Sequence, residues 1–507
     1  MNKHSLLPLL VPASLMAQER TMPNVVLIYA DDLGYGDLSC YGAKQIQTPH
    51  IDRLSQHGVR FTNAYAPAAT STPSRYAILT GEYAWRRPGT DVAAGNAGMI
   101  IRPERYTLAD LFRHEGYATG VVGKWHLGLG DKDGEQDWNA PLSCTPADLG
   151  FDYSYIMAAT GDRVPCVFIE QGRVSGYDPS APIEVRYTHP YEGEPLGRTH
   201  PELLTKLRHS HGHDMSIVNG IGRIGYMRGG GKALWRDEEI ADSIVHRSKR
   251  FIDEHRSKPF FLYLAPNDVH VPRYPHPRFR GKSSMGLRGE AILQLDWTVG
   301  QITSHLKRRG LLDNTIIIVS SDNGAIIDDG YADRAEELLG GHDPSGGLRG
   351  HKYSAFDGGA RIPAIVHWPK GLRGGQVSHE LVSQIDWFAS MAAMLEARLP
   401  EGVPHDSQDD RSAWLSAGKS SRPYVICQAA NKTLSIRRGR WKYIEPHKGP
   451  KMIPWGAKVE TGNYPTHQLY DMESDPREER NVADEHPELV DELRELLVKE
   501  RARGLGL

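Results

Sequence analysis

The chain has 507 residues, of which 39% are hydrophobic and 24% are charged, as in an ordinary globular protein. Its 60 lysines and arginines against 63 aspartates and glutamates give a formal net charge of -3, so there is no basic excess to steer a nucleic acid or an acidic membrane. The cysteines are too few and too scattered for a disulfide framework or a zinc cluster, although a bridge between Cys144 and Cys166 stays open.

The N-terminus has the pattern of a secretion signal. Lys3 precedes an apolar run at residues 6–11, and a small residue follows at Ala17. Residues 1–17 are therefore predicted to be a signal peptide, which would place the protein in a periplasm or outside the cell, and a disordered tail is the alternative. No later apolar run approaches the ~20 residues that a membrane-spanning helix needs, so no membrane span is expected.

A buried strand is predicted near the start of the chain, because residues 24–30 are mostly branched and aromatic. This strand runs directly into Asp31 and Asp32. Two adjacent carboxylates repel each other unless a cation lies between them. The pair is therefore a candidate metal site, and a turn or a helix cap is the ordinary alternative.

Residues 71–75, Ser-Thr-Pro-Ser-Arg, are the most informative stretch of the chain. Pro73 indicates a helix start, where free backbone N–H groups and the helix dipole favour an anion. Arg75 offers a planar fork of donors to the oxygens of such an anion. An unmodified Ser71 hydroxyl is a weak nucleophile, since it needs an adjacent base. Taken alone, the segment also fits a capped helix with a solvated arginine.

Two further strand-like runs end in basic side chains. Residues 118–122 lead into Lys124 and His126, and residues 259–264 lead to His270. A near-neutral imidazole is suited to proton transfer. Each loop alone would also fit an ordinary surface turn or a structural histidine.

A second buried strand is predicted at residues 315–320, and it ends in Asp322 and Asn323. It delivers a carboxylate and an amide oxygen from a strand end. Such all-oxygen ligands suit a hard cation such as calcium better than zinc, which prefers nitrogen and sulfur. The predicted set is Asp31, Asp32, Asp322 and Asn323.

Strand-like runs alternate with amphipathic helical ones, which indicates an α/β sandwich. Residues 131–231 instead form a long insertion with little periodicity, and such insertions usually build binding pockets over a rigid sheet. A stretch rich in Gly, Pro and Ser at residues 400–421 marks the end of the main domain. Beyond it, we expect short antiparallel strands near residues 424–426, 434–436 and 441–444, and a terminal helix with Leu489, Leu493, Leu496 and Leu497 on one face.

Together these segments resemble the sulfatase family, the formylglycine-dependent type I sulfatases of the alkaline phosphatase superfamily. The match rests on Ser-x-Pro-x-Arg at residues 71–75, on Gly-Lys-Trp-His at 123–126 and on Gly-Gly-x-Arg-x-Pro at 358–363, which follows Lys352. The resemblance implies an alkaline-phosphatase-like sandwich with a large mixed central sheet flanked by helices, plus a smaller C-terminal α+β subdomain with a short antiparallel sheet. The expected domains are a catalytic domain at 20–405 and a subdomain at 420–507.

The resemblance also implies a mechanism. A maturation enzyme oxidises Ser71 to formylglycine, whose hydrate attacks sulfur with one hydroxyl and expels sulfate with the other. His270 acts as the acid on the bridging ester oxygen, and His126 as the base when sulfate leaves. Fixed cations and calcium neutralise the charge on sulfate. The implied catalytic residues are Ser71, Arg75, Lys124, His126, His270 and Lys352, and the implied calcium ligands are Asp31, Asp32, Ser71, Asp322 and Asn323.

The insertion resembles that of bacterial exo-acting sulfatases that remove 6-O-sulfate from galactose or N-acetylgalactosamine, in host glycans such as mucin O-glycans, keratan or chondroitin sulfate. Asp162 and Arg163 can bind adjacent sugar hydroxyls as acceptor and donor, which would discriminate an axial from an equatorial O4, and a surface ion pair is the alternative. His213 is a further candidate sugar contact. His351 stands where a small residue is expected, so it is a candidate to narrow the pocket or touch substrate.

One departure from the family concerns Ser71, which stands where cysteine is usual. It implies a serine-type enzyme or a substitution, and an unconverted serine would be nearly inactive.

Two other classes stay open: a phosphate mono- or diester or phosphonate hydrolase of the same superfamily, and a carbohydrate-binding homologue that is never matured. The single oxygen-rich metal site, without the spread of His and Asp ligands that two zinc ions need, argues against a phosphatase.

Overall fold

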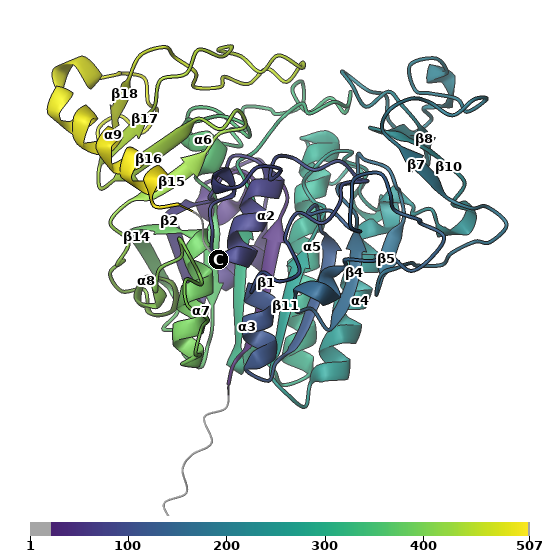
Figure 1. Cartoon of the computed structure of the whole chain (residues 1–507), viewed down its shortest axis with the longest axis horizontal. Coiled ribbons are helices and arrows are strands. Elements are labelled where there is room, and N and C mark those ends of the chain that lie inside the picture. Colours follow the sequence, from purple (N-terminus) through teal and green to yellow (C-terminus); the bar gives the residue numbers. More distant parts are fainter. Residues whose placement is uncertain (1–21, 505–507) are drawn as a thin grey trace, which may run out of the picture.

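A ten-stranded mixed sheet forms the centre of the molecule, in the strand order β14-β2-β13-β12-β1-β11-β3-β4-β5-β6 (Figure 1). The structure, a computed structural model, describes residues 22–504, so the predicted signal peptide at residues 1–17 lies outside the described part. The strands are β1 (Asn24–Ala30), β2 (Val59–Tyr65), β3 (Ala118–Lys124), β4 (Tyr153–Met157), β5 (Phe168–Glu170), β6 (Arg173–Val174), β11 (Phe260–Ala265), β12 (Thr315–Ser321), β13 (Ala364–His367) and β14 (Gln376–Ser383).

The middle of the sheet is parallel. Strands β12, β1, β11, β3 and β4 pair in parallel in that order, and every residue of β1, β3, β11 and β12 is buried. Strands buried on both faces are nearly continuous apolar runs, which is why the sequence identifies them. Their carboxyl ends meet at one edge of the sheet, where ligands bind in open α/β folds.

Helices cover both faces of the sheet, so the predicted sandwich is confirmed (Figure 1). On one face α5 contacts both α1 and α4, and on the other face α2 contacts α3 and α7, which in turn contacts α8. The short helix α6 follows the segment that carries Lys352. The bounds are α1 (Pro49–Gln56), α2 (Ser71–Thr80), α3 (Leu108–His114), α4 (Ile240–His255), α5 (Gly286–Arg308), α6 (Asp357–Ala360), α7 (Trp387–Leu395) and α8 (Arg411–Ser416).

The C-terminal part contains the expected small antiparallel sheet, in the order β15-β16-β17-β18, and a terminal helix α9, at the upper left of Figure 1. Leu493 and Leu497 of α9 are buried in a cluster with residues of this sheet. Lys442 of β17 pairs with Asp357 of α6 at 2.9 Å, both buried, and so ties this part to the main domain. The bounds are β15 (Val425–Gln428), β16 (Leu434–Arg438), β17 (Trp441–Ile444), β18 (Gln468–Asp471) and α9 (Pro487–Ala502).

The insertion carries two short antiparallel pairs, β7 (Glu184–Arg186) with β10 (Tyr226–Arg228), and β8 (Ile217–Val218) with β9 (Ile221–Gly222). The Cys144–Cys166 bridge that the sequence left open is not formed. Cys144 donates to the Asp131 carboxylate at 3.0 Å, whereas Cys166 is fully buried and its sulfur faces the Arg163 carbonyl. Within residues 22–504, no helix is long and apolar enough to cross a membrane.

Candidate active site

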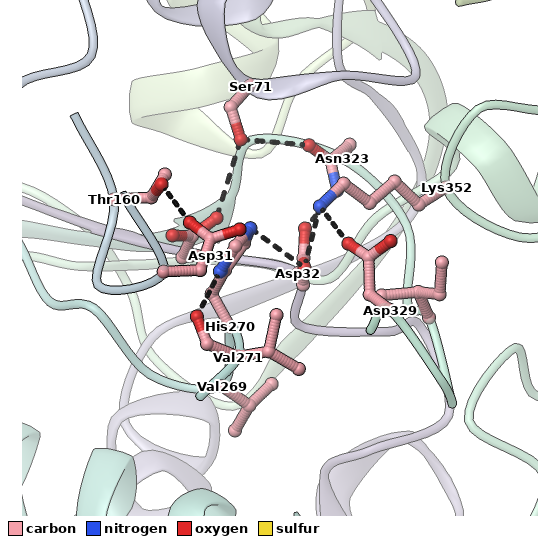
Figure 2. Close-up of polar contacts among 12 residues, drawn as sticks. Asp31, Asp32, Ser71, Thr160, Val269, His270, Val271, Asn323, Asp329 and Lys352 are labelled. Carbon is pink, nitrogen blue, oxygen red and sulfur yellow. Dashed lines mark hydrogen bonds and ion pairs between the residues drawn. The ribbon is translucent and has the colours of Figure 1, made fainter. Parts of the chain in front are cut away.

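The carboxyl ends of the parallel strands gather the predicted residues into one cluster (Figure 2). Asp31 follows β1, Asp322 follows β12, and Lys124 is the last residue of β3. Close packing of the loops helps to form the cluster, since a Cβ on Gly324 would lie only 1.8 Å from the Gly358 carbonyl oxygen. The glycine after Asn323 is thus required by a backbone contact with the α6 segment.

Ser71 begins α2 and lies at the centre of this cluster. Its Oγ receives a hydrogen bond of 2.7 Å from Lys124 Nζ. It also lies 3.4 Å from both Asp31 Oδ1 and Asn323 Oδ1 (Figure 2). The side chain is only 3% exposed. The helix begins at the serine itself, so its free N–H groups lie around this oxygen, as expected for an anion site.

The carboxylates beside Ser71 fit a hard cation. Burial raises the pKa of Asp31, against the opposing charge of Lys124. Its Oδ2 is buried and has no hydrogen-bond partner among residues 22–504, which is costly unless a cation binds there. Asp32 accepts from the Asn323 amide at 2.8 Å and lies within reach of Lys352. The oxygen donors therefore suit calcium, the predicted ion.

Asp322 is oriented by Arg75, a contact that sequence could not specify. Arg75 Nε and Nη2 both bond Asp322 Oδ2, at 3.1 and 2.8 Å, and Nη1 donates to the Tyr263 hydroxyl at 3.0 Å. Burial alone would raise the pKa of Asp322, but the charges of Arg75 and Lys124, together with hydrogen bonds, hold that pKa well below its usual range. Arg75 is fully buried, does not line the cavity and has its guanidinium turned to the Asp322 carboxylate, so its expected contact with sulfate stays a prediction.

His126 has the hydrogen bonding of a base. Its Nε2 lies 2.9 Å from the Ala93 carbonyl oxygen and must donate to it, which leaves Nδ1 as an unprotonated acceptor. Nδ1 is buried and has no partner in the described part of the chain. Burial, reinforced by Lys124, lowers the pKa of His126 well below its usual value, so the ring is neutral.

His270 has the opposite arrangement. Its Nδ1 donates to the Val271 carbonyl at 2.6 Å, and Nε2 lies 3.7 Å from Asp32 Oδ2 (Figure 2). The two histidines thus differ in the ring nitrogen that a backbone carbonyl occupies, Nε2 in His126 and Nδ1 in His270.

Lys352 lies beside Asp329 and Tyr353, two residues that the sequence did not single out. Its Nζ bonds Asp32 Oδ2 and Asp329 Oδ2, each at 2.9 Å, and the Tyr353 hydroxyl donates to Asp329 at 2.9 Å. Burial alone would lower the pKa of Lys352, but Asp32 and Asp329 raise it well above its usual value. The only sequence signal for Asp329 is an Asp-Asp-Gly turn, which is a common surface feature.

A cavity of about 550 Å³ opens over Ser71 and reaches into the insertion. Asp162 and His213 lie in its wall, with His213 Nε2 2.9 Å from Asp162 Oδ2, and Arg163 Nη1 is 3.2 Å from Asp162. Burial would raise the pKa of Asp162, yet Arg163 and His213 hold it well below its usual range. The three predicted sugar contacts therefore form one buried polar group that faces the cavity.

His351 differs from the other predicted sugar contacts, Asp162, Arg163 and His213, which all line the cavity. It does not line the cavity wall, and its Nδ1 pairs with the Ser345 hydroxyl at 2.7 Å. The expected substrate contact at His351 is therefore not supported. The chain reverses at Lys352, and the next residue, Tyr353, has φ of 81°, so neighbouring side chains point to different sides.

The site is also marked by backbone strain. Asp32, His126, His213 and Tyr353 have φ of 58°, 57°, 52° and 81°, the left-handed region that non-glycine residues rarely adopt. Each such residue costs of order 1–3 kcal/mol and persists where the surrounding structure requires it. All four lie in or beside the cavity, and eight other non-glycine residues of the described part also have positive φ.

Comparison with known proteins agrees with this geometry. The family model described as Sulfatase matches residues 23–397. An N-acetylgalactosamine-6-O-sulfatase of Bacteroides thetaiotaomicron is 53% identical over 486 residues, which cover 96% of this chain and 94% of that protein. Human arylsulfatase A is 31% identical over 494 residues, covering 94% and 87%.

The similarity extends to solved structures. A structure described for the metabolism of multiple glycosaminoglycans by Bacteroides thetaiotaomicron has a TM-score of 0.93 at 53% identity, and the match covers 95% of this chain and all of that one. The expected alkaline-phosphatase-like fold is confirmed. By sequence over most of its length and by structure, this chain belongs to the sulfatase family.

Proposed function

We propose that this sulfatase hydrolyses the 6-O-sulfate of a galactose or N-acetylgalactosamine at the non-reducing end of a glycan, with Ser71 converted to formylglycine and calcium bound. The observation that carries the proposal is the position of Ser71. Its Oγ receives a 2.7 Å hydrogen bond from a buried lysine, lies 3.4 Å from one oxygen of the Asp31 carboxylate, whose other oxygen has no hydrogen-bond partner among residues 22–504, and faces a cavity of about 550 Å³. That volume is typical of sites for small ligands.

Positive charge around Ser71 would stabilise the charge that develops on the sulfate oxygens. Lys124 Nζ contacts the oxygen of residue 71 directly, and Lys352 lines the cavity. Calcium, held by Asp31 and the other predicted oxygen ligands, would supply further positive charge. The hydrated formylglycine would supply the hydroxyl that attacks sulfur. Arg75 acts through Asp322 as a positioning residue, because it fixes which carboxylate oxygen can turn to the metal.

Two proton transfers complete the reaction. As the bond between sulfur and the ester oxygen breaks, His270 Nε2 gives a proton to that oxygen, so that an alcohol leaves. When sulfate is released, His126 Nδ1 takes the proton of the second hydroxyl on residue 71, and an aldehyde forms again. The support for these roles is that His126 Nε2 is occupied by a carbonyl and His270 Nε2 faces a carboxylate.

The proposed sugar specificity rests on the wall of the cavity and on the relative named N-acetylgalactosamine-6-O-sulfatase. Asp162 and Arg163 offer a charged acceptor and donor that are already aligned, and His213 fixes the acceptor. Such a pair would bind O3 and an axial O4 together and would leave an equatorial O4 unpaired. The proposal includes three further points. The sugar belongs to host mucin or glycosaminoglycan chains, a maturation enzyme converts Ser71, and the protein is exported from the cytoplasm.

A panel of sulfated monosaccharides, assayed with matured enzyme and calcium, tests the proposal. We expect the 6-O-sulfated galacto sugars to be hydrolysed fastest and Ser71→Ala to hydrolyse none. Faster hydrolysis of a glucose-configured or 2-O-sulfated sugar would contradict the specificity. Faster hydrolysis of a matched phosphate or phosphonate ester would favour the superfamily alternative, and sugar binding without turnover by protein with unmodified Ser71 would favour the carbohydrate-binding alternative.

A further inference from the structure

The mouth of the cavity carries an exposed tryptophan that the proposed reaction does not use. Trp455 is 50% exposed and lines the cavity. No hydrogen bond links the indole to residues 22–504, so the exposed part of this aromatic ring is available to a ligand at the cavity mouth. Trp455 belongs to residues 450–462, a segment between β17 and β18 that we call the rim loop.

The rim loop is held firmly against the active site. The backbone pairs Ile453 N with the Val459 carbonyl and Ala355 N with the Thr461 carbonyl, each at 2.9 Å. Ile453 and Val459 are buried in a cluster with Ile326 and against Tyr353. The loop is therefore a fixed part of the cavity wall, contributed by the C-terminal part of the chain.

The orientation of Trp455 is also fixed. Its ring meets the Tyr353 ring edge-on, with centroids 5.2 Å apart and an interplanar angle of 87°. Tyr353 is held in turn by its hydroxyl bond to Asp329, the partner of Lys352. Contacts therefore connect Lys352, the proposed sulfate-binding lysine, to the Trp455 ring at the mouth of the cavity.

We infer that Trp455 is the platform for a second sugar, the one that is linked to C1 of the sulfated sugar. This inference rests on the proposed function. If the 6-sulfate lies at Ser71 and O3 and O4 lie at Asp162 and Arg163, the C1–C2 side of the sugar remains to face the cavity mouth, and C1 carries the glycosidic bond to the next sugar. Aromatic faces bind the apolar C–H face of a pyranose, and a rigid, half-exposed ring loses little entropy when it does so.

The test compares two substrates that share the sulfated sugar. One is the 6-O-sulfated monosaccharide, and the other is a disaccharide that carries it at the non-reducing end. We expect the wild type to prefer the disaccharide and Trp455→Ala to lower kcat/KM for the disaccharide about tenfold, while kcat/KM for the monosaccharide changes less than about twofold. Trp455→Phe should retain most of the preference.

Met452→Ala is the matched control, because Met452 is 49% exposed in the same loop but does not line the cavity, and it should leave both substrates unaffected. Fluorescence gives a second readout: the unsulfated disaccharide should change the tryptophan emission of the wild type but not of Trp455→Phe. Equal losses on both substrates, or a fluorescence change that persists in Trp455→Phe, would overturn the inference. If the wild type hydrolyses neither the monosaccharide nor the disaccharide, that result would instead refute the proposed function.

Discussion

Replacing Lys124 with methionine removes the cation nearest to the proposed nucleophile while keeping a long side chain. The ammonium is fully buried and bonds Ser71 Oγ at 2.7 Å and Asp31 Oδ1 at 2.8 Å, and it lies 3.6 Å from Asp322 Oδ2. Because Lys124 contacts the proposed nucleophile, beside the sulfate oxygens on which charge would develop, Lys124→Met should lower kcat about 10²–10³-fold, equivalent to about 2.7–4 kcal/mol. KM should change much less, since Lys124 does not line the cavity.

Stability provides an independent readout of the same variant. Without Lys124, the buried carboxylate of Asp31 loses its closest cation, and breaking a buried pair typically costs about 3–5 kcal/mol. Calcium can replace that charge. Lys124→Met should therefore be strongly destabilised in a chelator and much less so in calcium, as measured by thermal unfolding, with conversion of Ser71 checked first by mass spectrometry.

Lys442→Met is a matched control, because Lys442 is also buried and paired, with Asp357 at 2.9 Å and Glu478 at 2.7 Å, but lies outside the cavity. It should lose stability equally with and without calcium. A Lys124→Met enzyme with kcat within about threefold of the wild type, or with the same stability loss in calcium and in chelator, would refute the reasoning.

The remaining predictions concern the metal, the sugar and pH. A chelator should abolish activity, and calcium should restore it more fully than zinc; activity that survives exhaustive chelation would exclude an essential ion. Asp162→Asn should bring the preference for galacto over gluco substrates close to one, measured as a ratio of kcat/KM values, and an unchanged ratio would remove Asp162 from recognition. Burial lowers the pKa of His367 to about 4, so the folded protein binds a proton at His367 less readily than the unfolded chain does. The free energy of unfolding should therefore fall as pH drops from about 6.5 through 4, by up to about 3 kcal/mol. His367→Gln should lack this component in urea unfolding at pH 7 and 4.5, and identical pH slopes for the two proteins would contradict the assignment.

The strands and the residues at their ends were predictable from sequence. Residues 24–30 and 315–320 are apolar because both faces of the parallel sheet are covered, and the polar residues that follow them stand out sharply. The short strands after residue 421 were also visible, since they alternate and end at turns. These features follow from local patterns that the tertiary structure preserves.

Other features depended on long-range contacts that no local pattern records. Asp329 reaches Lys352 from a turn in an irregular segment, and Trp455 reaches Tyr353 from another chain region. Asp322 is oriented by Arg75, which lies far from it in the sequence. His351 turns away from the cavity and pairs with Ser345, which its residue type does not reveal. The chemical groups of the site could be inferred from residue types, whereas the contacts between these groups could be seen only in the folded chain.

The most direct test of the account is mass spectrometry of the peptide that contains Ser71, from protein produced in a host that matures serine-type enzymes. The account predicts that this peptide lacks two hydrogens relative to serine, and that sulfatase activity among preparations rises in proportion to the converted fraction. Full activity in protein whose Ser71 is entirely unmodified would contradict it.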